Sequence, residues 1–324
     1  MVGDQLSEVF DLVEVRGLLS GGFAIRGPWV SRAAVDISLK FIAVVCGRAR
    51  LVTDGIDGID GPIELAAGDV AILNGRSWLE LRGGTGDGPP REVTPEENDP
   101  ATRLVGIDWD TDDVILGGHV DLNPAGRALL LQALPPVAHI RTAANLRGTL
   151  HRLFEEVSTD RIGSAFAIRQ YGQLLLLEVL RAYVEQTPLP SGWLRALTDD
   201  RLRPALTLMH TEPGRPWRLD ELAQAATMSR TSFAERFRTV AGMPPLTYLN
   251  HWRMLLAQRA LRDGDVRVGS LAADLGYASE SAFSTAFKRE VGESPLRYRH
   301  RLRAESGHLD AVRGNGSQVT RPLR

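Results

Sequence analysis

An internal repeat in the last third of the chain constrains the fold more than any other feature. The run LAQAATMSRTSFAERFRTVAGMPPLTYL at Leu222–Leu249 returns as LAADLGYASESAFSTAFKREVGESPLRYR at Leu271–Arg299. Matching residues are 49 apart at the start and 50 apart further on, so one copy has an extra residue where a turn is expected. A solenoid needs roughly three or more repeats. The pattern therefore predicts two similar folded units rather than a repeat array.

Each copy has the sequence pattern of a helix-turn-helix motif. A short apolar helix leads into a turn, and Ser229 or Ser279 then stands where a helix N-cap is expected. At about 100° per residue, Phe233, Phe237 and Val240 share one face of the second helix, which must be core. The opposite face is polar or cationic, as expected of a helix that enters the major groove of DNA. The outward residues are Thr231, Ala234, Glu235 and Arg238 in the first copy and Ser281, Ser284, Thr285 and Lys288 in the second.

Charge is divided unevenly along the chain. The formal net charge of -2 combines -10 over residues 1–200 with +8 over the remaining 124 residues. A basic part that coincides with the repeat favours nucleic-acid binding. In a lone helix-turn-helix the outward side chains could equally form an ordinary solvated face, but duplication and positive charge favour DNA. The connecting helix expected at Leu246–Leu261 would hold two reading helices about one DNA turn, roughly 34 Å, apart.

With these motifs, residues 201–303 resemble the DNA-binding domain of the AraC/XylS family of transcriptional regulators. The second copy and the intervening AGMPPLTYLNHWRMLLAQRAL carry most of the resemblance. It implies reading helices at Arg230–Val240 and Glu280–Val291 in successive major grooves of double-stranded DNA, and it adds Arg230 and Glu280 to the DNA-binding residues. Glu235 departs from the family pattern, in which Arg or Gln is common. A carboxylate can accept a hydrogen bond from cytosine N4, but it repels phosphates.

The front of the chain, from about residue 7 to residue 140, consists of short apolar runs broken by glycine, aspartate and asparagine. Such runs predict the strands of a β-sandwich or barrel. The stretches FIAVVCGRARLVTDG, IELAAGDVAIL and LNPAGRALLLQALPPVAHIR resemble the cupin-type sensor domain that often precedes this DNA-binding domain. Enzymatic cupins bind a metal through histidines and a glutamate, and no histidine occurs in FIAVVCGRARLVTDG or in GRSWLEL. We therefore expect no metal ion and no cofactor.

A β-barrel of this size can enclose a cavity for a small effector molecule. Arg48 and Arg76, near strand ends, are candidate anchors for an anionic ligand, although each could be an ordinary solvated side chain. Cys46 is the only cysteine, which excludes an intramolecular disulfide. It is a candidate redox switch through sulfenic acid or an intermolecular disulfide, or else a buried inert thiol. The other candidate lining residues, each of which could instead be core, are Phe23, Phe41, Val44, Trp78 and Trp109.

Two helices are expected after the strands, at Ala143–Val157 and Ser164–Glu185. They carry more apolar surface than one face of a barrel needs, so part of that surface is predicted to form a homodimer contact. Thr187–Gly192 contains two prolines and predicts a hinge through which an effector could act. The expected division is a cupin-like effector-sensing domain at 1–141, dimerisation helices at 142–186, a linker at 187–200, the DNA-binding domain at 201–303 and a disordered tail at 304–324.

The expected fold is therefore multidomain: an N-terminal all-β cupin-like barrel with dimerisation helices, then a C-terminal all-α domain of two helix-turn-helix motifs. The start of the chain does not have the pattern of a signal peptide, and no apolar run reaches the ~18 residues of a membrane span, so we expect a cytoplasmic protein. The expected function is sequence-specific transcriptional regulation under a small-molecule or redox signal, with RNA polymerase as a partner of an activator. The alternative is a cupin enzyme with a helical docking module.

Overall fold

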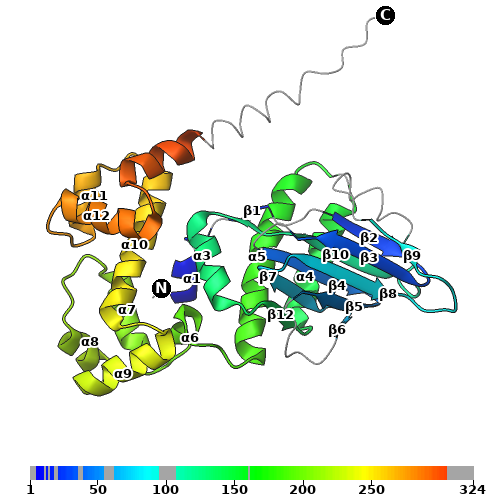
Figure 1. The fold of residues 1–324 in the computed structure, drawn as a ribbon, viewed down its shortest axis with the longest axis horizontal. Helices are drawn as coiled ribbons and strands as arrows, with labels where there is room; N and C mark the ends of the chain where they lie inside the picture. The colour runs from blue at the N-terminus through cyan, green and yellow to red at the C-terminus, as the bar shows by residue number, and fades with distance from the viewer. Residues whose placement is uncertain are drawn as a thin grey trace, which may run out of the picture. The chain divides into compact units, whose positions relative to one another are not determined.

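The computed structural model describes residues 5–10, 12–13, 15–17, 21–35, 39–54, 62–94, 107–159 and 161–304 (Figure 1). The chain forms two compact units. One runs from Val9 to Pro190, and the other runs from Ser191 onwards and also includes the start of the chain as far as Glu8. The boundary between them falls inside the segment predicted to be a hinge. The tail predicted at 304–324 lies outside the described residues except for residue 304.

The described strands of the Val9–Pro190 unit form two five-stranded sheets and one two-stranded sheet. The first five-stranded sheet has the order β12-β7-β4-β10-β2, with all neighbours antiparallel. Its strands are β2 (Gly21–Ile25), β4 (Leu39–Cys46), β7 (Val70–Asn74), β10 (Asp113–His119) and β12 (Val137–Ile140).

The second five-stranded sheet has the order β6-β5-β8-β3-β9, in which only the β3–β9 pair is parallel. Its strands are β3 (Trp29–Ala34), β5 (Arg48–Thr53), β6 (Ile63–Ala66), β8 (Trp78–Gly83) and β9 (Arg91–Glu92). The two-stranded sheet pairs β1 (Val15–Gly17) with β11 (Asp121–Leu122).

One hydrophobic core fills the space between the two large sheets. Ile42 and Val44 of β4 belong to the same buried cluster as Leu51 of β5 and Leu81 of β8. Phe41 is also buried but lies outside this cluster, because successive side chains of a strand point to opposite faces. In the pairing of the described strands, β2 and β12 are edges of one sheet and β6 and β9 are edges of the other. These strands thus form a sandwich of two sheets, without the closure expected of a barrel.

Helices cover the outer face of the first sheet. α4 (Ala144–Val157) packs on β4 and on α5 (Ser164–Gln186), and α5 also packs on β12, whereas α3 (Pro124–Ala133) packs on β11 (Figure 1). The inward side of α5 is buried along residues 172–183. Its other side leaves apolar side chains in solvent: Phe166 is 61% exposed and Leu174 is 41% exposed. The helical pair predicted from the sequence is present, and it has an unburied apolar face.

Between Trp193 and residue 304 the second unit is built of helices. The motifs predicted from the repeat are α8–α9 and α11–α12, and α10 connects them. The predicted linker at 187–200 contains α6, because Trp193 and Leu194 are buried and the Gly192 N–H donates to the Val240 carbonyl oxygen at 2.9 Å. The helices are α6 (Trp193–Leu197), α7 (Arg203–Thr211), α8 (Leu219–Ala225), α9 (Arg230–Ala241), α10 (Pro245–Asp263), α11 (Val268–Asp274), α12 (Glu280–Val291) and a stretch at residues 295–304.

A short helix near the start of the chain, α1 (Gln5–Phe10), precedes the first strand. None of the described helices combines the length and the apolar character that a membrane crossing requires.

Candidate nucleic-acid interface and N-terminal pocket

The two candidate reading helices, α9 and α12, start and stop in the same way. The Ser229 hydroxyl accepts from the backbone N–H of Ser232 at 3.2 Å, and the Ser279 hydroxyl accepts from that of Ala282 at 3.1 Å. Each helix ends at a glycine with a left-handed backbone, Gly242 at φ 74° and Gly292 at φ 89°. This conformation favours glycine and closes the last helical turn. The predicted N-caps and helix starts are confirmed.

Buried aromatic side chains anchor both reading helices. Phe233 and Phe237 are fully buried, and the Phe237 ring meets Tyr248 of α10 edge-on at 5.5 Å. In the second copy Phe283 and Phe287 are fully buried as well, and the Phe287 ring meets Tyr298 at the same 5.5 Å. Edge-to-face pairs at this separation are a favoured aromatic geometry. The inner faces predicted from the repeat are therefore built alike.

The outer faces of the reading helices are also alike in exposure. Over ten positions from Arg230 and ten from Glu280, the sequence of exposed, intermediate and buried residues is identical in the two copies. Ala234 and Ser284 are intermediate in exposure. The remaining predicted DNA-binding residues are all exposed: Arg230, Thr231, Glu235, Arg238, Glu280, Ser281, Thr285 and Lys288.

Charge distinguishes the two outer faces. At the start of α9, Arg230 lies 3.6 Å from Asp220 of α8 as an exposed ion pair. At the matching place in the second copy, Glu280 lies against Gly269 of α11, where an added Cβ would be 2.8 Å from the Glu280 carboxylate. An acid at a helix start is favoured by the helix dipole, whereas it disfavours a nearby phosphate. The two helix starts therefore differ in charge, with an arginine at the start of α9 and a glutamate at the start of α12.

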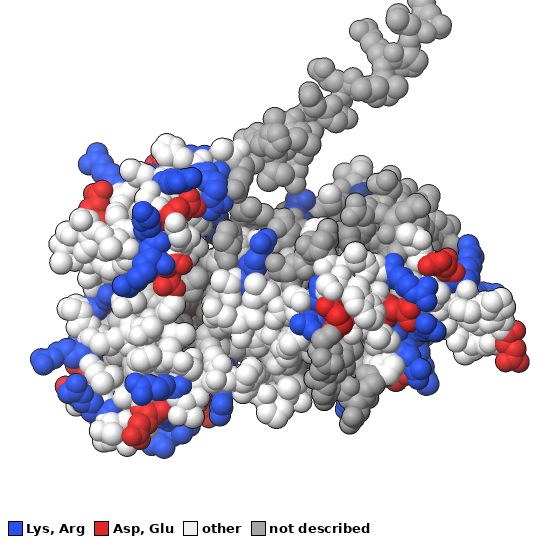
Figure 2. Space-filling view, in the orientation of Figure 1, with Lys and Arg blue, Asp and Glu red and all other residues white. Residues whose placement is uncertain are grey.

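The connecting helix α10 spans about 28 Å at ~1.5 Å per residue, which approaches the length of one DNA turn. Figure 1 shows α8–α9 and α11–α12 at the two ends of α10. On the face seen in Figure 2, Lys and Arg side chains are interspersed with Asp and Glu over this helical unit. Binding of a polyanion would thus depend on a few well-placed cations rather than on one continuous basic surface.

The first copy is held by contacts that the repeat does not contain. Arg236 of α9 donates two hydrogen bonds to Asp199, at 3.2 and 2.7 Å, and residue 286 at the matching position is alanine. His210 of α7 stacks on Trp252 at 3.9 Å, and its Nε2 lies 2.9 Å from the Tyr248 hydroxyl. Its Nδ1 lies 2.9 Å from the Glu8 carboxylate, within the same unit. Burial lowers the pKa of His210 to about 4.

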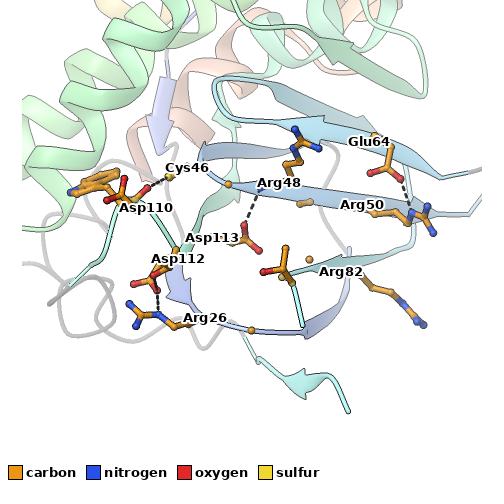
Figure 3. A pocket seen from close by; sticks show the side chains of 17 residues that line it. Arg26, Cys46, Arg48, Arg50, Glu64, Arg82, Asp110, Asp112 and Asp113 are labelled. Atoms are coloured by element: carbon orange, nitrogen blue, oxygen red, sulfur yellow. Dashed lines mark hydrogen bonds and ion pairs between the residues drawn. The ribbon is translucent and has the colours of Figure 1, made fainter. Parts of the chain in front are cut away.

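A pocket of about 820 Å³ opens in the N-terminal unit, where the β4–β5 turn lies near the start of β10 (Figure 3). Asp113 fixes the wall of the pocket by accepting from the Trp29 indole N–H at 2.7 Å and from the Arg48 backbone N–H at 3.0 Å. Gly47 has φ 78°, and a Cβ there would lie 1.9 Å from Asp113 Oδ1. Glycine is therefore required at this turn.

Most of the charged groups of the pocket are paired. Arg26 donates to Asp112 at 3.0 Å, and a backbone N–H together with this guanidinium holds the pKa of Asp112 below its usual range. Arg50 donates to Glu64 at 2.7 Å. The guanidinium of Arg48 is exposed and makes no hydrogen bond or ion pair with any residue that the structure describes. Arg48 is thus the cation available to an incoming ligand.

The pocket includes some of the predicted ligand-binding residues and not others. Arg48, Trp109 and Cys46 line it. Arg76 does not, since its Nη1 donates to the Asp54 carbonyl oxygen at 2.9 Å. Trp78 does not line the pocket, and 41% of it is exposed to solvent elsewhere on the surface. Phe41 does not line it either, because it is buried on the helix-covered face of its sheet. Phe23 and Val44 lie in the core between the sheets.

The Cys46 thiol is half-buried at the pocket wall and donates to the Trp109 carbonyl oxygen at 3.1 Å. Among the described residues, no three or more His, Cys, Asp and Glu side chains gather as a metal site would require. Arg26, Asp112 and Asp113 were not among the residues predicted for this pocket. The signal for the two aspartates was the acidic run at residues 108–113, directly before an apolar segment.

Comparisons with known proteins cover both units. A family model described as a cupin matches residues 4–185, and one described as a helix-turn-helix domain matches residues 222–301. A putative AraC-like transcription regulator of Streptomyces lividans is 35% identical over 304 residues, which are 91% of this chain and 98% of the relative. The RCS-specific HTH-type transcriptional activator RclR of Escherichia coli K12 is 29% identical over 93% of this chain and 98% of its own length.

Among solved structures, the DNA-binding domain of the global transcriptional factor AdpA in complex with a target DNA is 34% identical. The match covers 33% of this chain and 96% of that domain, with a TM-score of 0.31.

Proposed function

The chain belongs to the AraC family of transcription regulators, and on that premise we propose that it reads specific DNA with α9 and α12 under the control of a small molecule bound in the N-terminal pocket. Its relatives are DNA-binding transcription regulators, so the alternative of a cupin enzyme is not favoured. A regulator of this kind acts in the cytoplasm, and an activator would in addition contact RNA polymerase.

The observation that carries the proposal is the identical exposure pattern of the two reading helices. Two helices that share a buried aromatic face and an outer face of the same exposure can enter two successive major grooves. Thr285 and Ser284 would meet base edges, while Arg238 and Lys288 would meet phosphates. Glu235 restricts the bases that the first helix accepts, because its carboxylate pairs with cytosine N4 and is repelled by phosphate.

The test is a gel-shift measurement with the full chain and a DNA duplex enriched by that chain from a random library. Thr285→Ala should relax the base preference at one position by about 1–3 kcal/mol, which is roughly 5- to 150-fold in relative affinity. Lys288→Ala should weaken binding to all sequences alike and reduce the slope of log affinity against log salt by about 1. Failure to enrich any duplex, or salt-independent binding, would contradict the proposal.

The effector we propose is a small anion held by Arg48 beside Trp109. The support is that Arg48 is the pocket cation without a partner among the described residues, next to an aromatic ring that is 45% exposed. In thermal unfolding with a panel of small carboxylates and phosphates, a ligand at ~100 times its Kd should stabilise the chain by about 2.7 kcal/mol. Arg48→Met should abolish the shift, and Arg91→Met, outside the pocket, should keep it. A shift that survives Arg48→Met would refute this site.

Cys46 is a second route for a signal at the same pocket. The support is that the Cys46 thiol is free and half-buried rather than fully enclosed, at the wall of the pocket. A peroxide would oxidise the thiol to sulfenic acid and leave as the alcohol or water. Mass spectrometry after mild peroxide treatment should find one added oxygen on Cys46 and an altered gel shift, and both should be absent in Cys46→Ser. An unaltered gel shift with oxidised Cys46 would restrict the thiol to a structural role.

We also propose that the exposed apolar face of α5 pairs two copies of the chain. Phe166 and Leu174 lie on that face, and Ile162 precedes it with its side chain in full contact with solvent. An isologous dimer would bury these groups and place two DNA-binding units on one operator. Sedimentation at micromolar concentration should give a dimer for the wild type and a monomer for the Phe166→Ser, Leu174→Ser double variant. A wild-type monomer would contradict the proposal.

A further inference from the structure

Three segments of the helical unit meet at one buried arginine. Arg253 lies in the middle of α10 and is only 9% exposed. Its Nε donates to the Pro213 carbonyl oxygen at 2.6 Å, and its Nη2 donates to the Arg215 carbonyl oxygen at 3.0 Å. Both acceptors belong to the loop between α7 and α8, in front of the first helix-turn-helix. The guanidinium thus fixes this loop on the connecting helix through two charge-assisted hydrogen bonds.

The same loop touches the turn of the second helix-turn-helix, backbone to backbone. A Cβ on Gly214 would lie 2.1 Å from the Asp274 carbonyl oxygen, and a Cβ on Gly276 would lie 2.1 Å from the Gly214 carbonyl oxygen. Gly276 has φ 75°, so its conformation also favours glycine. Two glycines are needed for this approach. We call the contact between residues 213–215, Arg253 and residues 274–277 the junction.

The junction is connected to the first helix-turn-helix motif and to the second reading helix. On one side the Arg215 guanidinium stacks on the Trp217 ring at 3.9 Å and pairs with Glu221 of α8 at 2.9 Å. On the other side the Arg253 guanidinium lies 5.9 Å from the Tyr277 ring, and Tyr277 meets Phe283 of α12 edge-on at 5.4 Å. A continuous set of contacts therefore runs from the first motif through Arg253 to the second reading helix.

We propose that Arg253 is a positioning residue that sets the angle and separation of α9 and α12, so that the protein accepts one spacing between its two DNA half-elements. The proposal rests on the proposed function, in which both helices bind one duplex. Without the junction the two motifs would be joined by α10 alone, and small bends of that helix would displace the outer ends of both motifs. The side chain of Arg253 would not touch DNA and would act through the backbone it holds.

The experiment uses the full chain and the duplex that it enriches, with the two half-elements located by single-base substitution. One base pair is then inserted or deleted between them, which moves one half-element by roughly 3.4 Å and turns it by about 35°. The wild type should lose at least about tenfold in affinity on either change. Arg253→Met should bind with less than a threefold difference among the three spacings, because its two motifs can adjust independently.

A second variant leaves Arg253 in place. Gly214→Ala puts a Cβ against the Asp274 carbonyl oxygen and wedges the junction open, and it should flatten the spacing dependence in the same way. Two matched controls should keep the wild-type dependence. Gly264→Ala places its Cβ 3.6 Å from the nearest atom, an ordinary contact, and Arg259→Met removes a half-exposed arginine of the same helix that pairs with Asp263.

The outcomes separate the two proposals. If the wild type binds no duplex, the proposed function itself fails. If the wild type binds but shows no spacing dependence, or if folded Arg253→Met and Gly214→Ala lose affinity equally at all spacings, the positioning role is refuted. Thermal unfolding of each variant identifies those that fold, and if Arg253→Met does not fold, the result with Gly214→Ala decides.

Discussion

The two helix-turn-helix copies share their inner and outer faces but differ in what holds them. Each reading helix begins at a serine cap, ends at a left-handed glycine and is anchored by two buried phenylalanines. The first copy is packed in addition against α6, and Arg236 of its reading helix is bonded to Asp199. The second copy is instead packed against the second half of α10, through Met254 and Leu261, and against Leu302, which follows the repeat. The repeated residues encode the reading module, and the residues outside the repeat anchor it.

The repeated residues and the anchoring residues outside the repeat should therefore respond differently to substitution. Substitutions at matching positions of the repeat should have matching effects in both copies. Substitutions in the anchoring contacts should affect one copy only. Three measurements of stability test this comparison.

The largest effect is expected in the two aromatic cores. Phe237→Ala and Phe287→Ala each remove a fully buried ring, so each should lower the free energy of unfolding by about 3–5 kcal/mol in urea denaturation. The controls are Leu246→Ala and Leu296→Ala, two matching leucines that are 42% and 53% exposed and should change it little. Losses that differ by more than ~2 kcal/mol between the two phenylalanines would show that the cores are not equivalent.

The next largest effect is a pH dependence of the free energy of unfolding. It should come from His210, which packs beside the first copy and has no counterpart beside the second. The pKa of His210 is lowered to about 4, below the roughly 6.5 of an unfolded histidine. As pH falls from 6.5 towards 4, the unfolded state binds a proton that the folded state does not, so stability decreases by roughly 3 kcal/mol over that window and is fully present above it. His210→Gln should remove this pH dependence in urea denaturation, whereas His251→Gln, at a half-exposed site, should keep it.

If the His210→Gln chain keeps the same loss of stability between pH 6.5 and 4, a group other than His210 causes that loss. The contacts of His210 would then contribute less to the stability of the folded chain than its burial indicates.

The smallest effect is expected at the helix starts. Ser229→Ala and Ser279→Ala each remove the cap hydrogen bond to a backbone N–H of the first helical turn, and each should cost about 1 kcal/mol of unfolding free energy. Replacement by aspartate, which also caps, should retain most of the stability. A loss at one serine only would indicate that the other helix start is held by its surroundings rather than by its cap.

The sequence predicted the reading helices closely because their signals are local. Capping serines, phenylalanines four residues apart and terminal glycines lie within about a dozen residues of one another, and α12 has the predicted bounds Glu280–Val291. The strand runs of the N-terminal unit were predicted for the same reason. Whether the two sheets close into a barrel was not predictable in this way, because closure depends on whether their edge strands, which are distant in sequence, pair with one another.

The pocket and the junction depend on partners that are distant in sequence. Trp29 and Asp113 are 84 residues apart, and Arg253 bonds to a carbonyl 40 residues earlier. In the sequence, Arg48 and Arg76 look alike, as arginines near strand ends. In the structure the Arg76 guanidinium donates a hydrogen bond to the Asp54 carbonyl oxygen, whereas the Arg48 guanidinium donates none to a described residue. Pairing of this kind is determined by the tertiary fold, so no local pattern distinguishes the two.

The contact between Gly214 and Gly276 has a consequence for the construction of hybrid regulators. A chimera that exchanges only the second motif would bring a foreign turn against the native loop, at a place where an added methyl group would clash with a carbonyl oxygen. Residues 213–215, Arg253 and residues 274–277 therefore have to be transplanted as a set. The two motifs follow one pattern, but they are exchangeable only together.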